Sequence, residues 1–185
     1  LTLDVRRYKR LKMFVHANRV EGETAVKDGE VTAFVRLGSD FKDNYYQYEI
    51  PLHMTPDRSD YKSENAADRD SVWPVANNVD ISLEDLVNLK IQRNSNAGYP
   101  RNVPFTITVN NRILTIVGNP DIGSLKTVML GIKNPLKGDV SNPRADDDGL
   151  AKCVEVWFNE LRVSEFDERG GTAAVADVAI KLADL

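Results

Sequence analysis

The stretch VTAFVRL at residues 31–37 and the stretch YYQYEIPL at residues 45–52 decide the fold of this chain. In both, apolar or aromatic residues occupy every second position. Successive side chains of a β-strand point to opposite faces of a sheet, so this alternation buries one face and exposes the other. Both stretches are therefore predicted strands. Pro51 has no backbone N–H to donate, which predicts that the second strand ends there or lies at a sheet edge.

The same alternation recurs along most of the chain. It predicts that Val154, Val156 and Phe158 point into the core and that Trp157 points to the opposite face. Asn110 and Asn111 tolerate a positive φ and predict a two-residue hairpin turn. The further predicted strands are residues 11–17, 105–109, 112–117, 126–132, 152–163 and 173–182.

One helix is predicted to follow Ser82. The Ser82 hydroxyl can accept a hydrogen bond from the first turn, and Asp85 fits the third position of a capping box. Leu83, Leu86 and Val87 come next at helical spacing. The polar stretch at residues 55–72 and the Pro- and Gly-containing stretch at residues 133–149 are predicted to be loops.

Seven or eight strands with one short helix indicate an all-β fold class. Alternating apolar faces suit two sheets stacked face to face, so the expected architecture is a β-sandwich of jelly-roll-like type. A small closed barrel is the alternative, because alternation alone does not separate the two. We expect the sandwich to span residues 1–172 and residues 173–185 to form an exit strand toward the rest of a longer parent protein.

Composition excludes several classes of function. The net charge of −4 argues against a nucleic-acid-binding protein, which would carry a basic stripe. No apolar stretch approaches the ~18 residues of a membrane helix. Cys153 is the one cysteine, so an internal disulfide and a cysteine-based metal site are excluded. Because Cys153 lies in a predicted strand, we expect a buried structural thiol.

No catalytic constellation stands out in the sequence. His16 and His53 lie in or beside predicted strands without a G-x-S-x-G nucleophile motif, so a structural role is predicted for both. The stretch GNPDIG at residues 118–123 lacks the pattern of a phosphate-binding loop and predicts a turn. No pair of carboxylates is singled out as in a glycosidase. The chain is predicted to be no enzyme and to need no cofactor.

The acidic run of Asp146, Asp147 and Asp148 offers the oxygen ligands that Ca²⁺ prefers. Its spacing does not fit an EF-hand loop. A solvated loop is the favoured interpretation, and a calcium site at these residues is the alternative.

The aromatic residues leave two interpretations open. Exposed rings on one face would form a sugar-binding platform, whereas the alternation favours packing in the core or in an interface. Interface cores are rich in Trp and Arg, so Trp157, Arg162 and Tyr45 are the candidate interaction residues, with Trp157 as the anchor. The charges after Trp157 also fit a solvated strand end. The full aromatic set is Tyr45, Tyr46, Tyr48, Trp73, Tyr99 and Trp157.

Several short motifs occur together in a fixed order. They are RLGSDF at 36–41, NYYQYEIPL at 44–52, VWP at 72–74, GNP at 118–120, GIKNP at 131–135, VWFNELR at 156–162, FD at 166–167, GG at 170–171 and KLAD at 181–184. With this set the chain resembles the SprA family, also called Sov, of very large cell-surface proteins of Bacteroidetes gliding motility and type IX secretion. The resemblance covers nearly the whole chain and departs from the family at Thr172, where a tryptophan is usual.

The resemblance implies that the parent protein is an outer-membrane translocon that passes folded proteins to the cell surface. This segment would be a non-catalytic structural or interaction domain. Its partners would be other parts of the translocon, secretion-system proteins or cargo. Charged residues fall throughout the strands, so we expect the domain in the aqueous phase, on the periplasmic or the cell-surface side of the outer membrane. The alternative function is a cell-surface carbohydrate-binding module.

Overall fold

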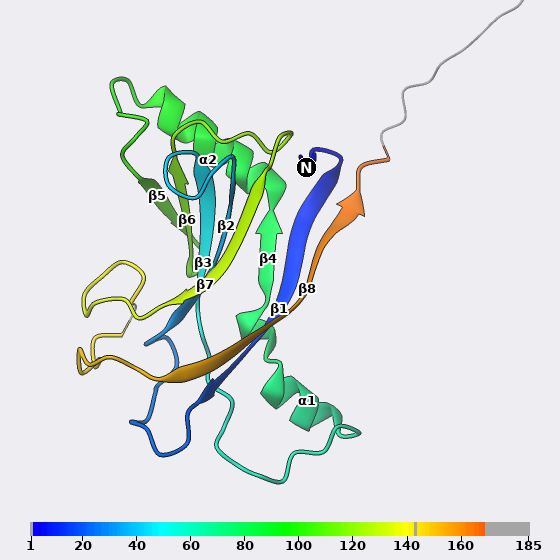
Figure 1. The fold of residues 1–185 in the computed structure, drawn as a ribbon, viewed down its shortest axis with the longest axis vertical. Helices are drawn as coiled ribbons and strands as arrows, with labels where there is room; N and C mark the ends of the chain where they lie inside the picture. The colour runs from blue at the N-terminus through cyan, green and yellow to red at the C-terminus, as the bar shows by residue number, and fades with distance from the viewer. Residues whose placement is uncertain (1, 143, 169–185) are drawn as a thin grey trace, which may run out of the picture.

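The computed structural model describes residues 2–142 and 144–168 as eight strands, two α-helices and one short 3-10 helix (Figure 1). The strands are β1 (Tyr8–Arg19), β2 (Thr32–Gly38), β3 (Tyr45–Pro51), β4 (Val79–Ser82), β5 (Phe105–Val109), β6 (Arg112–Val117), β7 (Thr127–Lys133) and β8 (Val154–Phe166). The helices are α1 (Ala66–Val72), η1 (Val75–Asn77) and α2 (Leu83–Ser95).

The strands form two antiparallel sheets. One sheet has the order β4-β1-β8, and the other has the order β5-β6-β3-β2-β7. Inward-facing apolar side chains of both sheets and of α2 make up one core. The predicted β-sandwich is thereby confirmed. The narrower jelly-roll assignment stays a prediction.

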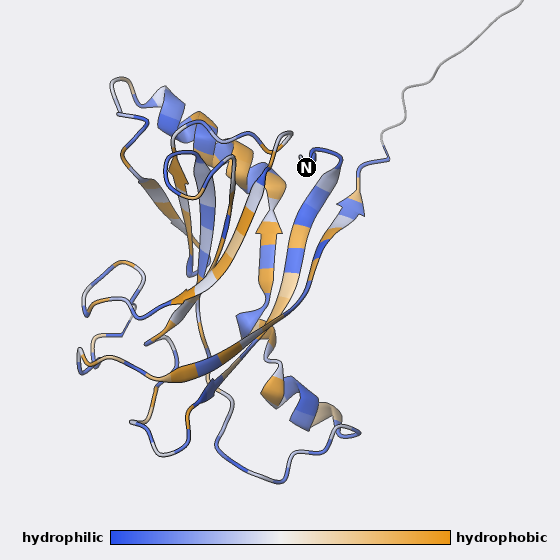
Figure 2. Cartoon of the chain, viewed as in Figure 1, coloured by the Kyte–Doolittle hydropathy of each residue, from blue (hydrophilic) through white to orange (hydrophobic). Residues whose placement is uncertain are grey.

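The core follows the period-two pattern of the sequence. Val15 and Ala17 of β1 are fully buried, whereas His16 between them points outward. The same alternation gives β2 its buried Val35 and the outward Arg36. Figure 2 shows this as bands of opposite hydropathy along the strands. The sequence pattern and the burial therefore agree on the inner faces of β1 and β2.

The predicted turn and helix start are confirmed. Asn110 has φ 49° and Asn111 has φ 60°, the left-handed conformation that a two-residue hairpin needs. At the start of α2, the Ser82 hydroxyl accepts a hydrogen bond from the backbone N–H of Asp85 at 3.3 Å. Leu86 and Leu89 of α2 are buried. Helix α2 therefore covers part of the core next to β4.

The stretch predicted as a loop at residues 55–72 contains α1, so that prediction is wrong. The Asn65 side chain caps the helix by accepting from the N–H of Ala67 at 3.0 Å. The carboxylate of Asp68 is buried, accepts from the N–H of Lys62 and pairs with Arg58. A helix held by polar contacts has no apolar stripe, so hydrophobic periodicity does not detect it.

The prediction for Cys153 is also wrong, because its side chain is exposed. Strand β8 begins only at Val154. Cys153 lies an even number of residues from Glu155 and Trp157, which point outward, and an odd number from Val154 and Val156, which point inward. Because successive side chains of an extended segment point to opposite faces, the thiol lies on the solvent side.

Within the described residues, no helix is long and apolar enough to cross a membrane. The predicted exit strand at residues 173–185 lies outside the described residues.

Candidate functional site: an aromatic face and an open edge

The outer face of the three-stranded sheet carries a group of ring side chains in mutual contact, with one arginine, that we call the aromatic face. It consists of Phe14, His16, Trp73, Trp157 and Arg162. His16 of β1 pairs with Trp157 of β8 in the strand register, and their rings meet edge to face at 5.7 Å. On its other side, the His16 ring lies 5.6 Å from Trp73, which follows α1. Three segments far apart in the sequence thus meet at one histidine.

The rings of the aromatic face are held in place by polar contacts. The indole N–H of Trp157 donates to the Glu155 carboxylate at 2.8 Å. The Nδ1 atom of His16 lies 2.7 Å from the backbone carbonyl of Val72 and 3.1 Å from the hydroxyl of Thr55. Trp157 nevertheless keeps 57% of its surface exposed. A large ring is therefore presented to solvent in a fixed orientation.

Arg162 continues the aromatic face at the far end of β8. Its guanidinium lies 4.9 Å from the centre of the Phe14 ring and pairs with Glu160 at 2.8 Å. A hollow of about 170 Å³ between Arg162, Phe14 and Asp80 lies beside this contact. Trp157 and Arg162, two of the predicted interaction residues, thus belong to one surface.

Tyr45, the third predicted interaction residue, lies on the other sheet. It points away from the core, and the guanidinium of Arg36 lies 3.9 Å from its ring centre. Tyr46 and Tyr48 are buried in the core. Burial raises the pKa of the Tyr46 hydroxyl to about 12. The structure therefore splits the aromatic set and does not bring Tyr45 to Trp157.

His53 sits apart from the aromatic face. Its Nδ1 atom lies 3.0 Å from the carboxylate of Asp28, which also accepts the N–H of Met54 at 2.8 Å. These contacts join the end of β3 to the turn before β2. Each histidine thus has partners that position local structure.

Lysine and arginine side chains form ion pairs with the acidic loop before β8. The carboxylates of Glu30, Asp147 and Asp148 lie within 4.8 Å of one another. The ammonium of Lys152, whose side chain is buried, lies 3.4 Å from Glu30 and 2.8 Å from Asp148. The hydrogen bond that Lys152 donates to Asp148 lowers the pKa of the Asp148 carboxyl. The positive charge that a calcium ion would bring is therefore already supplied by a lysine.

The carboxylates of Asp146 and Asp147 also have partners within the chain. Arg144 and Lys27 hold Asp146 at 2.7 Å and 2.9 Å and lower the pKa of its carboxyl. Asp147 is only 2% exposed and accepts from the side chain of Asn142 at 2.7 Å. Ion pairs and hydrogen bonds thus hold the loop, while Asp146 and Asp148 are exposed, and the solvated-loop interpretation and the calcium alternative both stay predictions.

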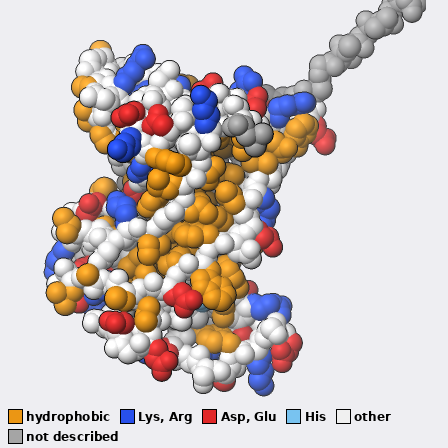
Figure 3. Space-filling model, viewed as in Figure 1, with side chains coloured by type: hydrophobic (Ala, Val, Ile, Leu, Met, Phe, Trp, Pro, Cys, Tyr) orange, Lys and Arg blue, Asp and Glu red, His pale blue; other side chains and the backbone are white. Residues whose placement is uncertain are grey.

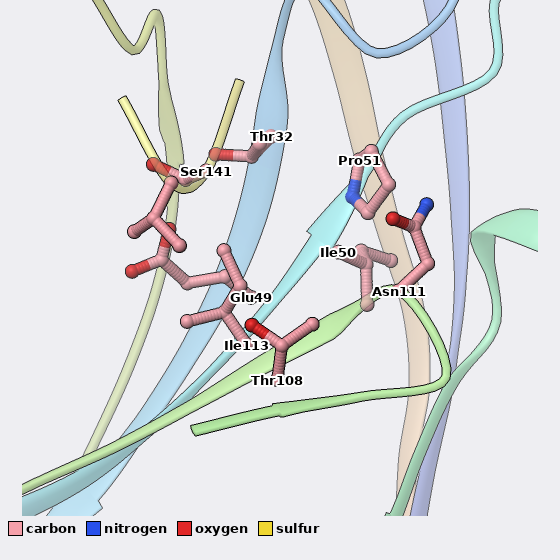
Figure 4. A pocket seen from close by; sticks show the side chains of 9 residues that line it. Thr32, Glu49, Ile50, Pro51, Thr108, Asn111, Ile113 and Ser141 are labelled. Carbon is pink, nitrogen blue, oxygen red and sulfur yellow. The ribbon is translucent and has the colours of Figure 1, made fainter. Parts of the chain in front are cut away.

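A small pocket of mixed polar and apolar lining lies under the same loop, on the outer face of the five-stranded sheet (Figure 4). Its volume of about 20 Å³ has room for a single water molecule. The buried carboxylate of Glu49 pairs there with Lys133 at 3.0 Å, and Lys133 also donates to the hydroxyl of Ser141 at 3.1 Å. The buried hydroxyl of Thr32 has no protein partner. The pocket fits a buried water rather than an organic ligand.

The second surface of interest is the open edge, formed by the inward-facing side chains of β7 and β8. Val128, Leu130 and Ile132 of β7 are 41%, 36% and 44% exposed. Between the two strands lies an apolar pocket of about 200 Å³ that Val128, Leu161 and Val163 help to line. Figure 3 shows hydrophobic side chains gathered over the region where Figure 1 places these strands. The core thus reaches solvent along one side of the sandwich.

A family model described as motility related/secretion protein, SprA_N, matches residues 1–185, the whole chain. The chain belongs to the SprA_N family. The predicted resemblance is thereby confirmed. No curated protein matches the chain.

Membership of the SprA_N family connects the chain to motility or secretion, and this family is not a known enzyme class. The family assignment does not say which residues act. In this SprA_N chain, sequence reasoning identified Trp157 and Arg162 but missed His16 and Trp73 as their neighbours. No spacing rule joins residues 16, 73 and 157, because their contact depends on the pairing of β1 with β8 and on the position of α1. The open edge was missed for a similar reason, since alternation shows which way a side chain points and not whether anything covers it.

Proposed function

We propose that this chain is a non-catalytic structural and interaction domain of an outer-membrane protein-secretion translocon. The parent would serve gliding motility and type IX export of proteins to the cell surface, with the domain in the aqueous phase. The family match supports the connection to secretion and motility. Its partners would be other parts of the translocon, secretion-system proteins or cargo.

The observation that carries the interaction role is the exposed and oriented ring of Trp157. Trp and Arg dominate the energetic centres of protein interfaces, where their rings and guanidinium groups are desolvated. Here Trp157 is fixed by Glu155 and His16, and Arg162 is fixed by Phe14 and Glu160. Side chains that are already ordered lose little entropy on binding, which favours a docking role.

A carbohydrate-binding module is the second candidate, and the exposure of Trp157 is the observation that favours it. Sugar platforms use the flat face of a ring. The contacts among Phe14, His16, Trp73 and Trp157 are edge to face or tilted, with interplanar angles of 51° to 74°. No coplanar pair of rings is found among the residues that the structure describes, which favours protein docking over sugar binding.

The test compares Trp157→Ala with Leu136→Ala in the intact parent protein. Leu136 is a more exposed apolar residue, at 79%, in the loop after β7 and outside the aromatic face. We expect Trp157→Ala to impair secretion and co-purification of secretion partners, and Leu136→Ala to leave both unchanged. Normal secretion and partner recovery with Trp157→Ala would refute the docking role. Binding of soluble oligosaccharides that is lost on Trp157→Ala would instead establish the carbohydrate-binding alternative.

A further inference from the structure

Strand β8 forms one edge of the three-stranded sheet. Among the described strands, β8 pairs with β1 alone. It has 13 residues, so a long row of backbone N–H and C=O groups lies on the side away from β1. Unpaired backbone groups of an edge strand can pair with an extended segment of another protein.

The inward side chains of β8 are covered less well than those of its neighbour β1. Val15 of β1 is fully buried, whereas Phe158, its partner in the strand register, is only partly buried. The same difference separates Ala17 of β1 from its partner Val156. Neighbouring strands shelter each other's side chains on one face of a sheet. A further strand beside β8 with apolar inward side chains would therefore remove Phe158 and Val156 from water.

The apolar pocket at the open edge can receive one such inward side chain. Its volume is about 200 Å³, and Leu161 and Val163 of β8 line it together with Val128 of β7. An apolar cavity of about 150 Å³ is large enough to hold a benzene molecule. The pocket therefore has room for an aliphatic side chain. Neighbouring strands lie about 5 Å apart, which puts the inward side chains of a strand beside β8 within reach of the pocket.

The charge of β8 indicates which kind of strand fits. It carries three glutamates and one arginine, so its net charge is −2. Arg162 already pairs with Glu160 at 2.8 Å, and Glu165 pairs with Lys12 at 3.3 Å. Among the described residues, no lysine or arginine pairs with Glu155. A second copy of β8 would bring the same negative charge, whereas a strand with lysine or arginine would neutralise it.

Glu155 lies beside Trp157 on the outer face of β8. Its carboxylate accepts the indole N–H of Trp157 at 2.8 Å, and the Trp157 side chain is 57% exposed. A cation beside this pair contacts a negative charge and an indole ring at the same time. Of the aromatic side chains, tryptophan attracts cations most strongly. The outer face of β8 therefore favours basic side chains, and its inner face favours apolar ones.

We propose that β8 accepts an extended strand of a partner protein in which apolar and basic residues alternate. The apolar side chains pack beside Val156 and Phe158 and enter the apolar pocket, and the basic side chains lie beside Glu155 and Trp157. This inference rests on the proposed function, because it names the kind of partner segment that docks at Trp157. In strand addition, backbone hydrogen bonds supply affinity and the alternate side chains supply specificity.

The test titrates three peptides into the 185-residue chain by calorimetry. The peptide acetyl-KVKIKVK-amide has the alternating basic pattern, EVEIEVE reverses its charge, and KKVIVKK keeps its composition without the alternation. We expect KVKIKVK to bind about tenfold more tightly than EVEIEVE, because it gains an ion pair and a cation–π contact. KKVIVKK should also bind less tightly, because adjacent residues of a strand point to opposite faces. Equal binding of the three peptides overturns the proposal.

Two glutamates of β8 provide a matched pair of variants. Glu155→Gln keeps an acceptor for the indole N–H of Trp157 but removes the negative charge, so it should weaken binding of KVKIKVK about threefold. Glu165→Gln should leave the binding unchanged, because that carboxylate already pairs with Lys12. Equal effects of the two variants would show that the charge of Glu155 does not select the peptide, and the proposal would be wrong.

Amide hydrogen exchange then locates the bound peptide. KVKIKVK should slow the exchange of those β8 amides that point away from β1 and leave the amides that face β1 unchanged. Binding without this protection overturns strand addition. Slow exchange of the outward amides before any peptide is added also overturns it, because the edge is then already covered. Protection that rises with protein concentration identifies a second copy as the cover, and constant protection identifies the same chain.

These measurements do not involve secretion, so the proposed strand addition and the proposed function can fail separately. If Trp157→Ala impairs secretion by the parent but KVKIKVK does not bind, the docking role stands and strand addition is refuted. If KVKIKVK binds as expected but Trp157→Ala leaves secretion normal, strand addition is confirmed and the role in secretion is refuted.

Discussion

The two long sides of the sandwich differ in how they are closed. On one side, β4 and α2 cover the inward face of β3 and β6, and Leu114 of β6 is 2% exposed. On the other side, β8 covers β2 but leaves β7 uncovered, and Leu130 is 36% exposed. Leu114 and Leu130 belong to the same sheet and point to the same side of it.

The difference shows that a period-two pattern specifies to which face of the sheet a side chain points. It does not specify whether another layer packs on that face. Strand β7 has the alternation of a core strand, with Val128, Leu130 and Ile132 on one face. Apolar residues of this number are costly to leave in water, at about 25 cal/mol for each Å² of exposed apolar surface. A side of a domain with such a strand is expected to receive a cover from further along the chain or from a partner.

The largest expected effect is on the closed side. Leu114→Ala should cost about 2–5 kcal/mol of unfolding free energy, because it removes a fully buried side chain. Leu130→Ala should cost less, about 1–2 kcal/mol, because this side chain is 36% exposed and only partly enclosed. Chemical denaturation of both variants measures these costs. Equal costs of the Leu114→Ala and Leu130→Ala variants would contradict this contrast, because they would show that β7 is covered as closely as β6.

A second prediction concerns the loop between β7 and β8, which is anchored by the buried Lys152. Lys152→Met should cost about 2–3 kcal/mol at neutral pH, because it leaves the buried carboxylate of Glu30 without its cation. Urea unfolding measures the cost. A neutral or stabilising effect would mean that the ion pair contributes nothing beyond its desolvation.

The same variant changes the response to acid. The pKa of Asp148 is lowered in the folded chain, chiefly by its hydrogen bond from Lys152. Its stabilising contribution is therefore complete above the ordinary carboxyl pKa of about 4 and is lost as the pH falls through the lowered value. Between neutral pH and about pH 2, the free energy of unfolding should therefore fall less steeply in Lys152→Met than in the unaltered chain.

Phe158 of β8 lies at the border between the two sides. It packs against the core but is only partly buried. Phe158→Ala should therefore cost about 2 kcal/mol, less than the 3–5 kcal/mol of a fully buried phenylalanine. Thermal unfolding measures the difference. A cost equal to that of a full core residue would show that the open side is closed more tightly than the described residues indicate.

The smallest effect on stability is expected at Trp157. Trp157→Ala should change the unfolding free energy by less than about 0.5 kcal/mol, because most of the ring is exposed. The loss of its contact with His16 is the only packing change expected on the aromatic face. Unfolding of the variant domain would show that the ring is a stability element and would remove the basis for its docking role.

Much of the fold follows from particular sequence signals. The alternation at residues 31–37 and 45–52 predicts β2 and β3, the Asn110-Asn111 pair predicts the turn between β5 and β6, and Ser82 predicts the start of α2. Each of these signals is local. The predicted strands differ from the observed ones mainly at their ends.

The features that sequence reasoning missed depend on contacts between distant segments. Strand β4 has four residues, too few for a clear alternation, and it exists because β1 pairs with it. Helix α1 depends on polar contacts of Asp68. On the aromatic face, the sequence indicated Trp157 and Arg162, but only the register of β1 and β8 places His16 beside Trp157. The exposed Cys153 shows that a shift of one position along a strand reverses the predicted burial, because neighbouring side chains face opposite sides.

The central claim is that the sandwich of the described residues is closed beside β6 and open along β7 and β8. Amide hydrogen exchange along β8 in the 185-residue chain tests it most directly, because alternate N–H groups of an edge strand point toward its neighbour and away from it. If the claim holds, the β8 amides that face β1 exchange slowly, and the set that points away from β1 exchanges fast. Slow exchange of both sets would show that the edge is covered and would contradict the claim.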